Sequence, residues 1–272
     1  MSVTGQSSWP YPFWVAHRGA GKLAPENTLA AFELGAKYGY RMFECDVKIS
    51  ADEQAFLLHD KTLTRTTNHA SAWGPGSDPL AGSHNWESLS RLDAGNWLSD
   101  AFAGEGLPLL RTIAQWCLKK SCLLNIEIKP TPGHGRRTGE VVAGLASDLW
   151  KDAGVPPLLT SFDPEALQAA ALVAPDLPRG FLLSRLHDGW LDAAKAMGCV
   201  AVVFDHPLWT SSTMAQAKEA GLRCLAYTVN DSREVDRLVG LGIDGIITDR
   251  VDLFKPDQPQ EAGATVTASS LA

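Results

Sequence analysis

Two acidic residues, Glu44 and Asp46, lie two positions apart in the mostly apolar and β-branched segment "FECDVKIS". Side chains at positions i and i+2 of a β-strand point to the same face, so both carboxylates share one side of the predicted strand. Burying neighbouring carboxylates is costly unless a positive charge compensates them. A divalent cation could provide that charge, and oxygen ligands favour Mg2+ or Ca2+ over zinc.

A second apolar segment, "LLNIEIK", repeats this spacing with Glu127 and Lys129. We expect Glu127 to join the first two acids around one cation. The positive side chains of Lys129 and of Arg18, which follows another apolar run, indicate an anionic substrate, because an arginine can direct two hydrogen bonds to one phosphate.

Two histidines also follow apolar runs: His17 ends "FWVAH" and His59 comes directly after "AFLL". An imidazole can act as an acid and as a base near neutral pH. A metal, two histidines and phosphate-binding cations together favour phosphoryl transfer or phosphodiester cleavage.

Short apolar runs alternate with helical patterns along the chain, which predicts parallel strands joined by right-handed helical crossovers. Eight such units favour a closed (β/α)8 TIM barrel, whose chemistry lies at the carboxyl ends of the strands, over an open doubly wound sheet. The strands are expected at residues 13–17, 42–47, 123–129, 157–161, 180–184, 200–204, 224–229 and 244–248. Helical patterns cover residues 28–39, 139–154, 163–173, 189–198, 213–221 and 231–242.

The loop after the first strand reads "LAPENTLAAF". Pro25 fixes the backbone, and either Asn27 or Thr28 is expected to cap a helix that begins near Leu29. Glu26 would then lie close to the positive end of that helix.

Other polar and aromatic residues carry weaker signals. Tyr227 ends the seventh predicted strand and could either line the pocket or pack in the core. The tryptophans at positions 73, 86 and 97 are expected to anchor a small lid. The remaining histidines lie in loops or near Gly and Pro, so solvent-facing roles are expected for His69, His84, His134, His187 and His206.

The composition narrows the class of protein. The 272 residues include 31 acidic and 24 basic residues, and the net charge of -7 argues against binding to nucleic acid or anionic lipid. No basic leader and no apolar stretch of membrane-spanning length occurs, which predicts a soluble cytoplasmic protein without stable membrane association. The five cysteines form no CxxC pair and are expected to be buried free thiols in a reducing compartment.

The chain is expected to form one catalytic domain over residues 1–255. Residues 60–108 are rich in Gly, Ser, Asp, Asn and Trp and predict an insertion at the mouth of the barrel, after the second strand. Residues 256–272 are small and polar, which predicts a disordered tail. No heptad or isolated apolar stripe marks an interface between subunits, so the oligomeric state is left open.

Several segments resemble the glycerophosphodiester phosphodiesterase family. The similarity begins with "AHRGAGKLAPENTLAAFELGAKYGYRMFECDVKISADEQAFLLHD" and continues with "LDAGNWLSDAFAGEGLPLL", "LNIEIKP", "LTSFDPEAL" and "YTVNDSREVDRLVGLGIDGIITDR". The order of these motifs from residue 13 to 252 is highly specific. The chain has Tyr227 where the family usually has Trp, and "TDRV" where the family has "TDRP", which changes only a turn.

The resemblance implies a (β/α)8 barrel that hydrolyses small-molecule glycerophosphodiesters to sn-glycerol 3-phosphate and an alcohol. Carried over by motif position, it also implies roles for nine residues. These are the acid/base pair His17 and His59, the ligands Glu44, Asp46 and Glu127 of one divalent metal ion, the phosphate contacts Arg18 and Lys129, and Glu26 and Asn27 as organisers of the mouth.

In the implied mechanism one histidine deprotonates the 2-hydroxyl of the substrate's own glycerol and the other protonates the leaving alkoxide. A cyclic phosphate forms and is then opened by water. Two alternatives stay open: a phospholipase C- or D-like phosphodiesterase that acts on membrane lipids, and a non-catalytic barrel that binds a phosphorylated ligand.

Overall fold

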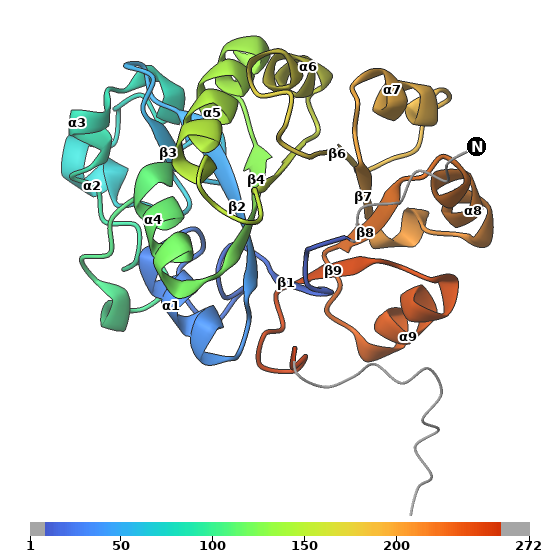
Figure 1. Ribbon diagram of the computed structural model, residues 1–272. Helices are drawn as coiled ribbons and strands as arrows, with labels where there is room; N and C mark the ends of the chain where they lie inside the picture. Colours follow the sequence, from blue (N-terminus) through green and yellow to red (C-terminus); the bar gives the residue numbers. More distant parts are fainter. Residues whose placement is uncertain (1–8, 257–272) are drawn as a thin grey trace, which may run out of the picture.

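The computed structural model describes residues 9–256. Eight parallel strands form a closed barrel, in which β1 pairs with both β9 and β2 and the remaining neighbours follow in sequence order (Figure 1). These eight strands are β1 (Trp14–Ala16), β2 (Met42–Ile49), β4 (Leu123–Ile128), β5 (Leu158–Ser161), β6 (Arg179–Leu183), β7 (Ala201–Asp205), β8 (Arg223–Tyr227) and β9 (Gly245–Thr248). The predicted TIM barrel is therefore confirmed.

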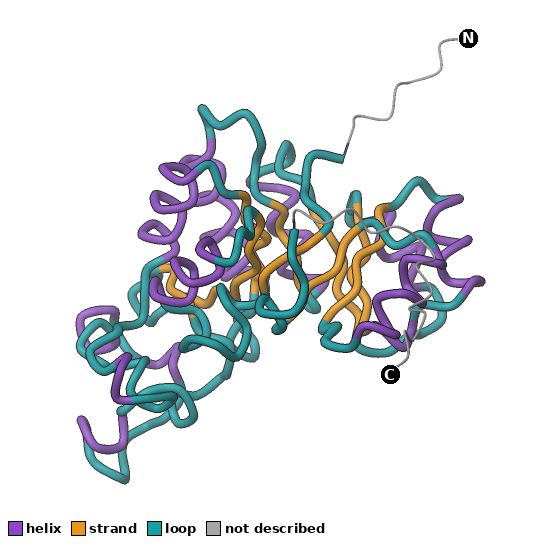
Figure 2. Tube along the Cα trace, turned by 90° about the horizontal axis from the view of Figure 1, so that it is seen from below, coloured by secondary structure: helices purple, strands orange, loops and turns teal. Residues whose placement is uncertain are grey.

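Helices cover the outside of the barrel, and the strands gather in the middle of the molecule (Figure 2). The outer helices are α1 (Leu29–Lys37), α4 (Leu110–Lys120), α5 (Gly135–Trp150), α6 (Pro164–Val173), α7 (Trp190–Ala196), α8 (Ser211–Glu219) and α9 (Ser232–Leu241), with the short 3-10 helix η3 (His206–Leu208) after β7. Of these seven α-helices, α4 has no counterpart among the helical patterns named from the sequence.

A ninth strand, β3 (Ala55–Leu57), pairs antiparallel with β2 outside the barrel. The insertion follows it and contains α2 (His69–Trp73), η1 (Ala81–Ser83), α3 (Trp86–Leu89) and η2 (Asp100–Phe102). α2, η1 and α3 contribute to a small apolar cluster that includes Phe56, Leu63, Leu89 and Leu107, whereas Phe102 of η2 packs against the main core. Trp73 and Trp86 contact this cluster, whereas Trp97 is 39% exposed and is not part of it. The lid role of these tryptophans stays a prediction.

The inside of the barrel is apolar toward the amino ends of its strands. Tyr11, Val15, Met42, Leu182 and Val203 belong to one buried cluster that fills this space. A larger apolar layer lies between the strands and the surrounding helices. The buried carboxylates Glu44, Asp46 and Glu127 lie beyond this cluster, toward the carboxyl ends of β2 and β4.

Several smaller expectations can be checked directly. All five cysteines are buried and free, as predicted. The expectation that His69 faces solvent is wrong, because His69 is buried at the start of α2 beside Trp73. Within residues 9–256 no helix is both long enough and apolar enough to cross a membrane. The predicted disordered tail lies outside the described residues, apart from Pro256.

Candidate active site

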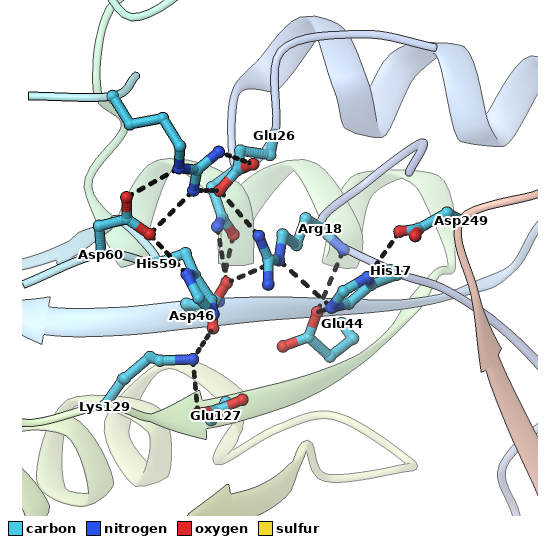
Figure 3. A network of polar contacts seen from close by, with 12 residues as sticks. His17, Arg18, Glu26, Glu44, Asp46, His59, Asp60, Glu127, Lys129 and Asp249 are labelled. Carbon is cyan, nitrogen blue, oxygen red and sulfur yellow. Dashed lines mark hydrogen bonds and ion pairs between the residues drawn. The ribbon is translucent and has the colours of Figure 1, made fainter. Parts of the chain in front are cut away.

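Three carboxylates meet at the mouth of the barrel. Glu44 and Asp46 lie on β2 and Glu127 lies on the neighbouring β4, where Asp46 and Glu127 are partners in the strand register. One oxygen atom from each carboxylate lies within 4.8 Å of the other two. All three residues are buried, and Figure 3 shows their side chains pointing into the same space. The structure thus brings together the three acids that strand alternation predicted.

The charges of these carboxylates are balanced only in part. Burial and the neighbouring carboxylates raise the pKa of Glu44 well above its ordinary value and raise the pKa of Glu127 to about 7. Burial would also raise the pKa of Asp46, but the positive charges of Lys129 and Arg18 outweigh it and lower that pKa. Two of the three acids therefore hold protons easily unless a further positive charge is supplied.

Two buried carboxylate oxygens lack hydrogen-bond donors within the part of the chain that the structure describes: Oε1 of Glu44 and Oε1 of Glu127. The second lies 3.0 Å from Nζ of Lys129 as an ion pair, but without hydrogen-bond geometry. A buried acceptor without a donor is costly. The three acids therefore fit a hard divalent cation, which would satisfy these oxygens and the excess negative charge.

His17 lies directly after β1, where Asp249 fixes its ring. Nδ1 of His17 is 2.7 Å from Oδ1 of Asp249. Burial would raise the pKa of Asp249, but the hydrogen bonds from His17 and Asn230 outweigh it and lower the pKa to about 2. Because the ionised carboxylate only accepts, Nδ1 of His17 is assigned as the donor and Nε2 as an acceptor. Nε2 lies 3.8 Å from Oε2 of Glu44 and accepts a hydrogen bond from Nε of Arg18 at 3.2 Å.

Asn230, which follows β8, holds Asp249 on its other side. Its Nδ2 donates to Oδ2 of Asp249 at 3.0 Å, and its Oδ1 accepts from the backbone N–H of Asp249 at 2.9 Å. Asn230 thereby orients Asp249. The contact of Asp249 with His17 joins the end of the last barrel strand to the end of the first and fixes the ring of His17.

The loop between β1 and α1 adopts an unusual backbone to place its polar groups. Arg18 and Asn27 have positive φ angles of 51° and 60°, a conformation that costs energy in residues other than glycine. At Gly21 the φ angle is +58°, and a Cβ atom would come within 2.1 Å of the carbonyl oxygen of Asp249. Only glycine lets this loop approach the end of β9 so closely.

Asn27 and Thr28 divide the roles predicted for them. Thr28 is the N-cap of α1, because its hydroxyl accepts from the backbone N–H of Ala31. Asn27 instead faces Asp46, donating to Oδ2 at 2.8 Å and accepting from the Asp46 backbone N–H at 3.1 Å. Thr28 is therefore the helix cap, and Asn27 orients the carboxylate of Asp46.

The second histidine, His59, follows β3 and is held in the same way as His17. Its Nδ1 lies 2.8 Å from Oδ1 of Asp60. Burial lowers the pKa of His59 below its ordinary value, because the charged imidazolium loses hydration. His59 therefore favours its neutral form near pH 7, with Nε2 able to accept a proton.

The cations predicted to bind phosphate also lie in this network. Arg18 approaches Asp46 to 3.4 Å and donates to Glu26 at 2.9 Å, and Lys129 donates to Asp46 at 2.9 Å. Lys48, which was not predicted, is buried on the same strand as Asp46 and donates to the backbone carbonyl of Lys129 at 3.0 Å. Burial lowers the pKa of Lys48 to about 8.

Tyr227 lines a small cavity beside the carboxylates, together with His17, Glu44 and Glu127. Its hydroxyl donates to the carbonyl of Leu183 at 3.2 Å, and the ring makes an edge contact with Phe162. Tyr227 also packs against the apolar cluster inside the barrel, so it fills both of the roles left open for it.

Besides Lys48 and Asn230, three further residues of this network were missed from the sequence. Asp60 directly follows His59, so its position alone could have indicated a partner for the ring. Asp249 follows the last strand, inside the tetrapeptide "TDRV" that was interpreted only as a turn. Arg65, which contacts both Asp60 and Glu26, lies in the insertion and carries no recognisable signal.

The fold and the site together define a class of protein: closed parallel barrels with carboxylates and histidines at the carboxyl ends of the strands. The family model described as "Glycerophosphoryl diester phosphodiesterase family" matches residues 17–253. The chain belongs to this family, as the sequence motifs predicted.

Individual relatives agree with this assignment. A protein of Bacillus subtilis (strain 168) is 33% identical over 253 residues, which cover 91% of this chain and 98% of that protein. A glycerophosphodiester phosphodiesterase of Caldanaerobacter subterraneus subsp. tengcongensis is 31% identical and covers 86% of this chain and 93% of its own. The solved structure of a phosphodiesterase from Oleispira antarctica, in complex with the product sn-glycerol-3-phosphate, has a TM-score of 0.79 and 29% identity, covering 88% of this chain and 93% of that one.

Proposed function

We propose that the protein hydrolyses small glycerophosphodiesters to sn-glycerol 3-phosphate and an alcohol, using one divalent cation and two histidines. The observation that carries this proposal is the convergence of Glu44, Asp46 and Glu127 with His17 and His59 at one mouth of the barrel (Figure 3). The product bound in the Oleispira antarctica phosphodiesterase supports the choice of substrate.

Glu44, Asp46 and Glu127 would hold the cation, Mg2+ or Ca2+. When bound, such an ion stabilises negative charge that develops on the phosphoryl oxygens. Arg18 and Lys129 would contact the same phosphate from the protein side, since both lie beside Asp46 and retain unused donors. Asn27 and Glu26 keep Asp46 and Arg18 in place.

The two histidines would move the protons. Asp249 and Asp60 hold the Nδ1 atoms of His17 and His59. Nε2 of His59 has no hydrogen-bond partner among the described residues, whereas Nε2 of His17 accepts from Arg18 and would exchange that bond for one with the substrate. One imidazole, unprotonated at Nε2, takes the proton from the glycerol 2-hydroxyl while that oxygen bonds to phosphorus. The other imidazole must carry a proton on Nε2 when the substrate binds, and it gives that proton to the alkoxide as the bond from this oxygen to phosphorus breaks. The resulting cyclic phosphate is opened by water with the two roles exchanged. Tyr227 would wall the side of the pocket that holds the glycerol or the head group.

The test is release of sn-glycerol 3-phosphate from glycerophosphocholine, read with a coupled dehydrogenase. Turnover should stop with excess chelator and return with Mg2+ or Ca2+. The His17→Ala and His59→Ala variants should each lose on the order of a hundredfold in rate. His187→Ala is the matched control, because this exposed histidine bonds only to a backbone carbonyl among the described residues.

Three outcomes would contradict the proposal. Full activity in chelator would remove the metal from it. Cleavage of phospholipid vesicles in place of the soluble diester would indicate a membrane phospholipase. Binding of glycerophosphocholine without any turnover would indicate a non-catalytic barrel. The single catalytic domain over residues 1–255 and the cytoplasmic location stay predictions.

A further inference from the structure

Arg65 lies in the insertion and contacts two carboxylates at the mouth of the barrel. Its guanidinium donates four hydrogen bonds to two carboxylates. Nε and Nη2 bind Asp60 at 2.7 and 2.9 Å, and Nη1 and Nη2 bind Glu26 at 2.7 Å each. Bidentate pairs of this kind fix orientation as well as distance, because the planar fork of arginine matches a carboxylate.

Each of these carboxylates holds one of the side chains proposed to act on the substrate. Asp60 contacts Nδ1 of His59 at 2.8 Å, and Glu26 accepts from Arg18 at 2.9 Å. Figure 3 shows Asp60 next to His59 and Glu26 above Arg18. A continuous chain of side-chain contacts therefore runs from His59 through Asp60, Arg65 and Glu26 to Arg18.

The ring of Trp97 supports the guanidinium from the insertion. The Cζ atom of Arg65 lies 5.9 Å from the centre of this ring, and Trp97 is itself 39% exposed. A cation over an aromatic face is attracted by the ring and loses freedom of movement. The insertion thus supplies both the bridging cation and the surface that holds it.

We propose that Arg65 is a positioning residue: by bridging Asp60 and Glu26 it fixes the positions of His59 and Arg18 relative to each other. Trp97 in turn holds the side chain of Arg65 in place. The inference rests on the proposed phosphodiesterase function. The insertion would then contribute to turnover. Without Arg65, the carboxylates of Asp60 and Glu26 would lie close together without a shared cation, and neither would be held in one orientation.

Steady-state kinetics of Arg65→Ala provide the first test. Because a small displacement of an acid or base is costly to the chemical step, kcat should fall on the order of 10- to 100-fold with little change in KM. Arg65→Lys should recover only part of the loss, since one ammonium cannot form two forks. Guanidinium chloride below denaturing concentrations should restore part of the activity of Arg65→Ala, whereas equal sodium chloride should not.

Two comparisons separate positioning from simple stabilisation. Arg91→Ala removes another arginine of the insertion, one that pairs with Glu87 at 2.6 Å on the surface, and should leave kcat and the rescue experiment unchanged. Trp97→Ala should lower kcat about two- to fivefold and should add nothing in the Arg65→Ala background. Independent losses in that double variant would overturn the role given to Trp97.

An activity-independent measurement keeps this inference separate from the proposed function. Long-range nitrogen–proton NMR spectra of the histidine rings should show one tautomer of His59, with the proton on Nδ1, in the wild-type chain and in Arg91→Ala. Arg65→Ala should show a mixture. A raised KM at unchanged kcat, or an unaltered His59 signal, would overturn the positioning role; an inactive wild-type protein would refute only the proposed function.

Discussion

Asp249 and Asp60 contact the same ring atom, Nδ1, of the two proposed catalytic imidazoles, but the two carboxylates are supported differently. Asp249 is held by the neutral amide of Asn230, whereas Asp60 is held by the charged Arg65. A carboxylate whose charge is already paired stabilises a positive ring less strongly than one that is not. The two imidazoles are therefore chemically distinct, although each has a carboxylate partner.

The low pKa of Asp249 predicts a dependence of stability on pH. Its folded pKa, about 2, lies below the ordinary 3.8, so it stabilises the fold above pH 4 and this contribution disappears as pH falls through 2. The side chain is only 15% exposed, and the shift corresponds to about 2 kcal/mol. Urea unfolding from pH 5 to pH 2 should show this loss in the wild type and not in Asp249→Asn.

Asn230→Ala is the control for that experiment, because it keeps the carboxylate and removes one of its donors. The acid-dependent part of the unfolding free energy should become smaller but should not vanish. If Asp249→Asn and the wild type lose stability in parallel, Asp249 is not the group responsible.

The sequence predicted those site residues whose side-chain orientation depends only on their place in a strand. Glu44, Asp46 and Glu127 could be predicted because strand alternation fixes the face of each side chain. Asp249 could not be paired with His17, since 232 positions separate them and only barrel closure brings them together. Arg65 was missed for a related reason: its function depends on two carboxylates from two other loops.

At the scale of elements, the loop between β1 and α1 has a constrained backbone, with four residues at positive φ angles. Gly19 and Gly21 have positive φ angles, as do Arg18 and Asn27, and Gly21 lies against the backbone of Asp249. The close packing of Gly19 against Ala31 and of Gly21 against Asp249 constrains the loop that carries His17 and Arg18.

Gly21→Ala should therefore impair both folding stability and turnover. The added methyl group would overlap the carbonyl of Asp249, and the left-handed backbone would add on the order of 1 kcal/mol of strain. We expect a lower melting temperature and at least about a tenfold loss of kcat, because His17 and Asp249 would separate. Calorimetry and the coupled assay would measure the two effects.

Gly242→Ala is the matched control for this substitution. Gly242 also has a positive φ, +86°, but nothing lies within 4 Å of its added Cβ, and it ends α9 at the opposite end of the barrel. It should lose some stability and keep full turnover. Equal losses of kcat in both variants would show that strain alone, rather than the contact with Asp249, matters.

The elements of the insertion were less predictable than those of the barrel. The barrel strands are continuous apolar runs, which local sequence reveals. The insertion instead collects apolar residues from distant positions, such as Phe56 and Leu107, into one small cluster without helical or strand periodicity. Three of its four short helices, α2, η1 and α3, pack on that cluster.

At the scale of the whole molecule, a bound cation should stabilise the barrel, because it would join β2 to β4 and offset the repulsion among three buried carboxylates. At a hundredfold excess over its Kd, Mg2+ or Ca2+ should add about 3 kcal/mol and raise the melting temperature by several degrees. The pKa of Glu127, about 7 without the ion, means that protons compete with the cation below pH 7. The increase should therefore be larger at pH 8 than at pH 6.

Scanning calorimetry with chelator and with each ion would measure this change. Glu127→Gln should reduce the stabilisation and its dependence on pH, since the amide has no charge to neutralise. A melting temperature that is identical with and without the ions would contradict a metal site at these carboxylates.

The contact between His17 and Asp249 has a consequence for how the protein is made. The ribosome releases His17 with the first strand and Asp249 only after the last one, so the nascent barrel stays open until β9 emerges and pairs with β1. A chain whose translation stops before residue 245 lacks both that closing strand and the carboxylate that orients the ring. Interrupted synthesis therefore yields products in which this histidine is never set in place.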